Sequence, residues 1–217
     1  KGAELRNRNL FANAALGPYS FNADESRPDT YLAVLPLFHI FGQTVIQNGG
    51  ILYGGTIVYL PRFEAVPALQ LLLKEKVSFF AGVPTMYWGL LGALSDPAAA
   101  DIDVAEIAKN LRVAAAGGSA LPGDIHRQFR EKFGVTILEG YGLSETSPVA
   151  SFSVWGEDPV VGSIGKPVEG VEMKLVDADH HDLPEDPEAI GEIAIKGHGI
   201  MKGYYNRPAA TAEAIDA

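Results

Sequence analysis

The sequence contains no cysteine, so disulfide bonds, thiolate nucleophiles and cysteine-ligated metals are excluded. No apolar run reaches the roughly 18 residues that a membrane-spanning helix needs. Positive charge is also scarce, because 17 Lys and Arg stand against 27 Asp and Glu and give a formal net charge of −10. With a pI of about 4.9, the chain is not expected to bind nucleic acid.

The chain also starts without a methionine, a signal sequence or an obvious helix cap. We therefore expect a segment of a longer protein, cytoplasmic by default, with peripheral membrane association and the oligomeric state left open. Apolar material is plentiful, since 47% of the 217 residues are hydrophobic and the mean hydropathy is +0.08. This composition excludes intrinsic disorder and indicates one large domain or two small ones.

From about residue 31 to 141, short β-rich runs alternate with Gly- or Pro-containing loops and helical stretches. The β-rich runs are apolar almost throughout, which is typical of parallel strands buried on both faces. We therefore predict an α/β fold with a mostly parallel sheet and helices on both faces. The predicted strands are residues 31–36, 56–61, 77–80, 111–115 and 135–138.

The pattern changes after about residue 150. Residues 171–177 and 191–197 alternate apolar and polar side chains, with a polar, turn-rich stretch between them. This pattern predicts an antiparallel hairpin in a small β-barrel-like subdomain. The predicted division is 1–30, 31–150 and an incomplete 151–217.

Four predicted strand-to-helix loops carry unusual residues. In a parallel sheet with right-handed crossovers, such loops lie at the carboxyl edge of the strands, where ligands bind. We therefore expect the four to converge, although they are spread over about a hundred residues. They are Pro36–Gly42, Ala81–Thr85, Ala115–Leu121 and Glu139–Thr146.

The third loop has paired glycines, Gly117 and Gly118, among other small residues. Such a pair lets backbone N–H groups approach a planar or anionic ligand. A tight structural turn is the simpler alternative. The loop lacks the spacing and the Lys-Ser/Thr ending of a Walker motif.

The fourth loop places a phenol, a hydroxyl and a carboxylate close together. Tyr141 offers a ring face for stacking a base, Ser144 offers a donor for a phosphate oxygen, and Glu145 offers a ligand for Mg²⁺. Alternatively, Glu145 caps a helix and Tyr141 belongs to the core. A hydrolase elbow around Ser144 is disfavoured, because Thr146 stands where that motif requires glycine.

The histidines give weaker signals. His39 follows an apolar strand, and such a histidine is more often a satisfied core residue than a functional one. His180 and His181 lie in an acidic turn and are interpreted as solvated. A Ca²⁺ loop there is rejected, because Asp182 stands at its glycine position.

Taken in order, these segments resemble the adenylate-forming superfamily of acyl-CoA synthetases, luciferases and peptide-synthetase adenylation domains. The sequences of two motifs, PLFHIFGQ and FFAGVPTMY, are most similar to those of the fatty-acyl-CoA ligase branch. The resemblance covers nearly the whole chain. Its motifs are KGAELRNRNL, LPLFHIFG, GVPTMY, AAGGSALP, EGYGLSET, VGSIGKPVEGVEMKLVD and GEIAIKGHGIMKGYYNRPAAT.

The resemblance implies a ligase that joins a fatty acid to CoA through an acyl-AMP, with ATP, Mg²⁺ and CoA as cofactor or co-substrates. Ser144 and Glu145 would act in catalysis, with Glu145 as the Mg²⁺ ligand. The nucleotide would contact Gly117, Gly118, Ser119, Glu139, Gly140, Tyr141, Gly142 and Leu143. The acyl group would be bordered by Phe38, His39, Val83, Pro84, Thr85, Ala116 and Gly142.

Some family features are absent from this chain. The glycine- and hydroxyl-rich part of the phosphate loop would precede Lys1, and the Thr-Gly-Asp ribose motif and the C-terminal domain with its catalytic lysine would follow residue 217. We therefore expect the isolated segment, residues 1–30 of which would be the tail of the phosphate-loop subdomain, to be inactive. An aryl-CoA ligase, a fatty-acyl-AMP ligase and a non-catalytic binding module remain alternatives.

Overall fold

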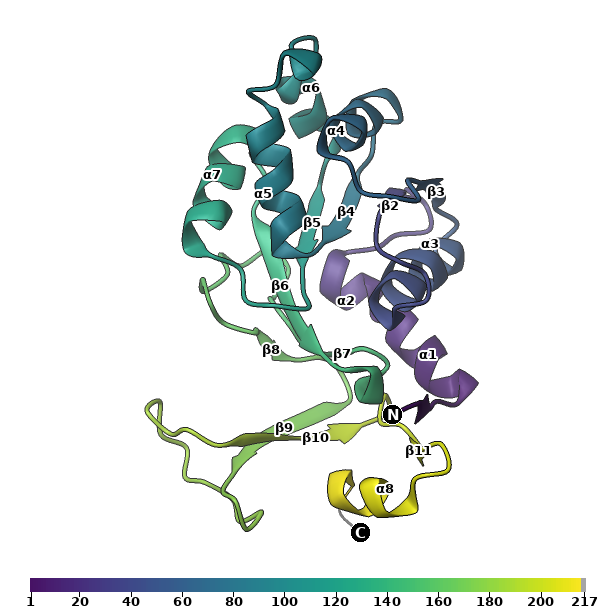
Figure 1. The fold of residues 1–217 in the computed structure, drawn as a ribbon, viewed down its shortest axis with the longest axis vertical. Helices are drawn as coiled ribbons and strands as arrows, with labels where there is room; N and C mark the ends of the chain where they lie inside the picture. The colour runs from purple at the N-terminus through teal and green to yellow at the C-terminus, as the bar shows by residue number, and fades with distance from the viewer. Residues whose placement is uncertain (216–217) are drawn as a thin grey trace.

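The computed structural model describes residues 1–215 and is built around a seven-stranded sheet in the order β3-β2-β4-β5-β6-β7-β8 (Figure 1). The five strands from β3 to β6 run parallel, and β7 and β8 add to this sheet as antiparallel strands. This arrangement confirms the predicted mostly parallel α/β fold. The strands are β2 (Thr30–Ala33), β3 (Thr56–Tyr59), β4 (Phe79–Gly82), β5 (Val113–Ala116), β6 (Ile137–Gly142), β7 (Val149–Phe152) and β8 (Lys166–Pro167).

Helices cover both faces of the sheet, as predicted (Figure 1). One face packs against α4 (Ala65–Lys74), α5 (Pro84–Ala93), α6 (Val104–Asn110) and α7 (Gly123–Phe133). The other packs against α1 (Asn7–Ala14), α2 (Gly17–Phe21), the π-helix η1 (Gly42–Asn48) and α3 (Gly49–Leu52). A short 3₁₀ helix, η2 (Pro97–Ala99), joins α5 to α6.

The central strands β2, β4 and β5 are almost entirely apolar because they separate two hydrophobic cores. In β2, Leu32 packs into the core under α4 to α7, while Tyr31 and Ala33 face the core under α2 and η1. In β4, Phe80 and Phe79 divide in the same way. Successive side chains of a strand point to opposite faces, so a strand covered on both sides needs apolar residues at every position.

Small antiparallel sheets follow the main sheet, as the sequence predicts. In the hairpin, β9 (Val171–Val176) pairs with β10 (Glu192–Gly197). A second pair joins the two ends of the chain, because β1 (Ala3–Glu4) lies antiparallel to β11 (Gly203–Tyr204), just before α8 (Pro208–Ala214) (Figure 1). The proposed three-part division of the chain remains a prediction.

Strand β6 ends later than predicted. The predicted strand stops at residue 138 and leaves Glu139 to Gly142 in a loop, whereas β6 continues through Gly142. The reason is tertiary, because Gly140 and Tyr141 pair with Phe152 and Ser151 of β7. The site residues of this segment therefore stand on a strand and on the short 3₁₀ helix η3 (Ser144–Thr146) that follows.

Other strand boundaries also differ from the predicted ones. Strands β2 and β3 stop earlier, at Ala33 and Tyr59. Strands β4, β5 and β6 begin two residues later, at Phe79, Val113 and Ile137. Within residues 1–215, no helix combines the length and the apolar character needed to cross a membrane.

Candidate active site

The four loops that the sequence predicts to converge do meet, and their contact point is the paired glycines. A Cβ built on Gly117 would lie 3.3 Å from the Phe41 ring and 3.3 Å from the carbonyl oxygen of Gly140. One built on Gly118 would lie 3.5 Å from Val83 Cγ1, and Gly118 has a φ of +84° that favours glycine. Segments 36–42, 81–85, 115–121 and 139–146 therefore meet at the carboxyl edge of the sheet, where we place the candidate site.

The surface of this site offers hydroxyl groups and a ring. Ser119 and Ser144 are exposed, and Tyr141 on β6 is half-buried. A structural framework holds the turn beneath Ser144: the Leu143 backbone N–H donates to Thr146 Oγ1 over 2.9 Å, and the Thr146 hydroxyl reaches the Pro148 carbonyl. Thr146 is thus a buried brace, a role that sequence reasoning missed.

Glu145 is held from a distant part of the chain. Its Oε1 accepts a 2.6 Å hydrogen bond from the Tyr204 hydroxyl, and its backbone carbonyl accepts one from the Met201 N–H over 2.9 Å. The hydrogen bond to the carboxylate raises the pKa of Tyr204 above its usual value of 10. Glu145 is not the N-cap of η3, which is Leu143.

Two further residues brace the site from outside it. The Asn13 side chain on α1 donates to the Val149 carbonyl over 2.9 Å and accepts from the Val149 N–H over 3.2 Å. The Ser147 hydroxyl donates to the Gly199 carbonyl over 2.7 Å. Neither residue was expected at the site from the sequence. A signal exists for α1, because Asn9 and Asn13, four residues apart, share one helix face and both are buried.

Glu139, expected to contact the nucleotide, points into the protein. Its side chain is only 8% exposed. Its two carboxylate oxygens accept hydrogen bonds from the backbone N–H groups of Leu121, at 3.4 Å, and Gly162, at 3.3 Å. The carboxylate therefore ties the end of the glycine loop to residues 160–164. A nucleotide contact by Glu139 stays a prediction.

The residues expected at the acyl group are placed unevenly. Phe38 is 96% exposed, and His39 and Thr85 are exposed as well, whereas Pro84 and Ala116 are buried. Ala116 belongs to the core under α4 to α7. Because His39 is exposed, it is not a core histidine. Its Nδ1 accepts a 3.2 Å hydrogen bond from the Phe41 N–H.

The glycines beside Tyr141 have a packing reason. A Cβ on Gly142 would fall 1.8 Å from the Pro148 carbonyl oxygen, and one on Gly140 would fall 2.6 Å from the Phe152 ring. Both glycines therefore permit the close approach of β7. The free space at Gly142 is taken by backbone, which gives it a structural role beside the predicted ligand contact.

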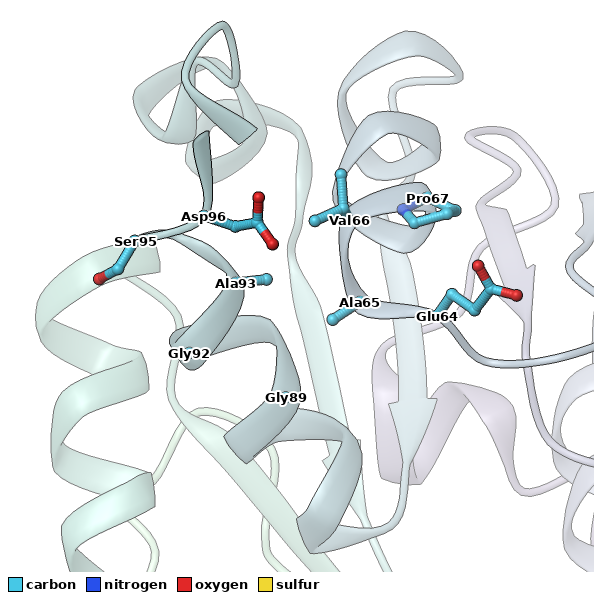
Figure 2. Close-up of a pocket in the computed structure, with 9 residues that line it drawn as sticks. All are labelled: Glu64, Ala65, Val66, Pro67, Gly89, Gly92, Ala93, Ser95 and Asp96. Atoms are coloured by element: carbon cyan, nitrogen blue, oxygen red, sulfur yellow. The ribbon is translucent and has the colours of Figure 1, made fainter. Parts of the chain in front are cut away.

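A groove of about 550 Å³ lies elsewhere, between α4 and α5 (Figure 2). Val66 and Asp96 point toward one another across it (Figure 2). None of the predicted site residues lines it. Within residues 1–215, no three His, Asp or Glu side chains gather as a metal-binding group.

Comparison with known proteins decides the family. The model of the AMP-binding enzyme family matches residues 1–205. The chain belongs to the AMP-binding enzyme family. It is 34% identical to a long-chain-fatty-acid–CoA ligase of Bacillus subtilis over 99% of this chain. It is 33% identical to 4-coumarate–CoA ligase 1 of Arabidopsis thaliana over 100% of this chain.

The solved structure of ATP-bound MatB from Rhodopseudomonas palustris has a similar fold, with a TM-score of 0.86 and 29% identity over 98% of this chain. The chain spans 37–38% of the length of the two curated relatives and 40% of the MatB chain. These family members therefore extend well beyond the segment described here.

Proposed function

We propose that the protein containing this chain is an ATP-dependent acyl-CoA ligase with a fatty acid as its acyl substrate. The observation that carries the proposal is the convergence of four loops at Gly117 and Gly118, the fourth of which carries Tyr141, Ser144 and Glu145. The family membership and the similarity to a fatty-acid–CoA ligase support it. The similarity to a 4-coumarate–CoA ligase favours an aryl-CoA ligase as the second candidate.

The proposed reaction has two steps. A carboxylate oxygen of the acid attacks the α-phosphorus of ATP, and pyrophosphate leaves with the electrons of the broken P–O bond. The CoA thiol, losing its proton to solvent, then attacks the acyl carbonyl, and AMP leaves. Negative charge on the phosphate oxygens and then at the acyl carbonyl must be stabilised in turn.

The residues of this chain divide that work. The Tyr141 ring stacks on the adenine, opposite the small residues of the glycine loop, and the Ser144 hydroxyl donates to the α-phosphate. Glu145 would hold Mg²⁺, and the bound ion would neutralise phosphate charge. Glu145 fits this role because Mg²⁺ beside nucleotides needs only one or two carboxylates, and its Oε2 accepts no hydrogen bond within residues 1–215.

The test is Glu145→Gln in the whole protein, measured by ATP–pyrophosphate exchange with a fatty acid. The substitution keeps the shape but removes the charge, so exchange should fall by about 10²-fold or more. Glu131→Gln, at an exposed position of α7, is the matched control and should leave the rate unchanged. An unchanged rate in Glu145→Gln at saturating Mg²⁺ would remove the metal role from the proposal.

A further inference from the structure

The hydroxyl of Tyr204 donates a 2.6 Å hydrogen bond to the Glu145 carboxylate, although 59 residues separate the two in sequence. We propose that Tyr204 is a positioning residue that holds the Glu145 carboxylate in the orientation required for Mg²⁺. The inference rests on the proposed function, because it assumes that Glu145 is the metal ligand. It adds a residue from the carboxyl-terminal part of the chain to the site.

Tyr204 can position another residue because it is itself fixed. Its backbone lies in β11, where it pairs with Ala3 of β1, and its N–H donates to Thr211 Oγ1 over 2.9 Å. The next residue is also held, since the Tyr205 N–H donates to the Gly2 carbonyl over 2.8 Å. On the ring, the Lys1 ammonium lies 4.9 Å from the centroid. Backbone and ring are therefore both constrained.

A glutamate that binds a metal needs a hydrogen-bonding partner that fixes its carboxylate. A glutamate side chain has three rotatable bonds, and ordering it costs conformational entropy. Metal-binding carboxylates are commonly oriented by a second hydrogen bond from the surrounding protein. Here the Tyr204 hydroxyl occupies Oε1 and leaves Oε2 for an ion, while the Met201 N–H holds the Glu145 backbone.

The competing explanation is structural: the hydrogen bond attaches residues 201–204 to the rest of the molecule and has no effect on a metal. The two explanations differ in what they predict for metal affinity. A purely structural bond would change the unfolding temperature when lost. A positioning bond would change the affinity for a divalent ion in the folded protein.

The experiment compares Tyr204→Phe with Tyr205→Phe in the whole protein. Both remove one phenolic hydroxyl, but Tyr205 is 64% exposed and its hydroxyl makes no hydrogen bond to residues 1–215. Mn²⁺ binding is measured by electron paramagnetic resonance in the presence of saturating ATP, and thermal unfolding is recorded alongside. Adenylation is then measured as a function of free Mg²⁺.

We expect Tyr204→Phe to weaken Mn²⁺ binding about tenfold and to raise the Mg²⁺ concentration at half-maximal adenylation similarly. The rate at saturating Mg²⁺ should recover to within about twofold of the parent, and Tyr205→Phe should match the parent throughout. Unchanged Mn²⁺ affinity in Tyr204→Phe, whatever its unfolding temperature, would overturn the proposal.

Glu145→Gln separates this inference from the proposed function. If Tyr204 acts through Glu145, adding Tyr204→Phe to Glu145→Gln should not weaken Mn²⁺ binding further. If Glu145→Gln alone leaves Mn²⁺ binding intact, the metal role of Glu145 fails. If Glu145→Gln weakens binding but Tyr204→Phe does not, only the positioning role fails.

Discussion

The two edges of the parallel sheet are built in opposite ways. At the amino edge, polar side chains pair with one another just before the strands begin: Asp29 accepts from Ser78 Oγ over 2.6 Å and from Arg112 Nε over 2.8 Å. Arg112 also donates to the Phe21 carbonyl over 2.6 Å and lies 5.5 Å from the Trp155 ring. This edge is closed, because its hydrogen-bonding groups are occupied by the protein.

The carboxyl edge keeps its reactive groups exposed. Phe38, Ser119 and Ser144 face solvent there, and the glycine loop brings backbone to the surface. The polar groups that are buried near this edge, such as Thr146, serve to hold its turns. The difference between the edges teaches that the polar groups of the amino edge are used within the protein, whereas those of the carboxyl edge stay available, as the proposed ligand site requires.

The largest effect is expected for Arg112→Leu, which tests whether the paired groups of the amino edge stabilise the fold. It leaves the buried Asp29 carboxylate without its cation, which should lower the free energy of unfolding by about 3–5 kcal/mol. Urea unfolding followed by circular dichroism measures the change. Nucleotide binding below the transition should be preserved, because Arg112 lies at the edge opposite the site.

The matched control is Arg130→Leu. Arg130 pairs with Asp158 over 3.1 Å, and both side chains are more than half exposed. A surface ion pair contributes at most about 1 kcal/mol, so this variant should unfold close to the parent. Equal losses in the two variants would mean that burial does not distinguish the amino-edge network.

The next prediction concerns the carboxyl edge, which we call the open edge, and tests the role of Tyr141 in ATP binding. If its ring stacks on adenine, Tyr141→Ala should weaken ATP binding by about 1–3 kcal/mol, provided that stacking values from single-strand binders apply. Tyr141→Phe keeps the ring and should be nearly silent. Equilibrium binding of ATP to the whole protein measures both. Equal damage from the two substitutions would assign the role to the hydroxyl and exclude stacking.

The sequence predicts much of the architecture, because it is encoded locally. Apolar runs such as 111–115 predict the strands, and the alternation of strands with helical stretches predicts the parallel sheet covered by helices. The convergence of the four loops follows from a topological rule. It is confirmed by the neighbours of the glycine pair, because a Cβ built on Gly117 would meet Phe41 and Gly140, and one built on Gly118 would meet Val83.

What the sequence does not predict depends on contacts between distant segments. Strand β6 continues through Glu139 to Gly142 because β7 pairs with it, and no local pattern in EGYG indicates this extension. The Tyr204–Glu145 hydrogen bond joins residues that the sequence separates by most of the β-rich part. Likewise, the sequence shows that residue 142 is a glycine, but only the structure shows that the Pro148 carbonyl occupies the space where a Cβ would lie.

The smallest expected effect, per added group, concerns the acyl substrate. The four loops of the open edge carry no Lys or Arg, so nothing there would pair with a second carboxylate of a dicarboxylic acid. Phe38 and the half-buried Phe41 and Val83 offer apolar surface instead. Each methylene that becomes buried should add up to about 0.8 kcal/mol of binding.

We therefore expect the specificity constant of the whole protein to rise along saturated acids from about two to about eighteen carbons, by up to roughly fourfold per buried methylene, and to level off where the pocket ends. Benzoate and coumarate, assayed alongside, represent the aryl-CoA alternative. Malonate tests the missing cation and should be a poor substrate. A best substrate with four carbons or fewer, or an aromatic one, would overturn the fatty-acid proposal. Such a result would leave the proposed adenylation chemistry standing, because the roles proposed for Tyr141, Ser144 and Glu145 concern the nucleotide, whichever acid is activated.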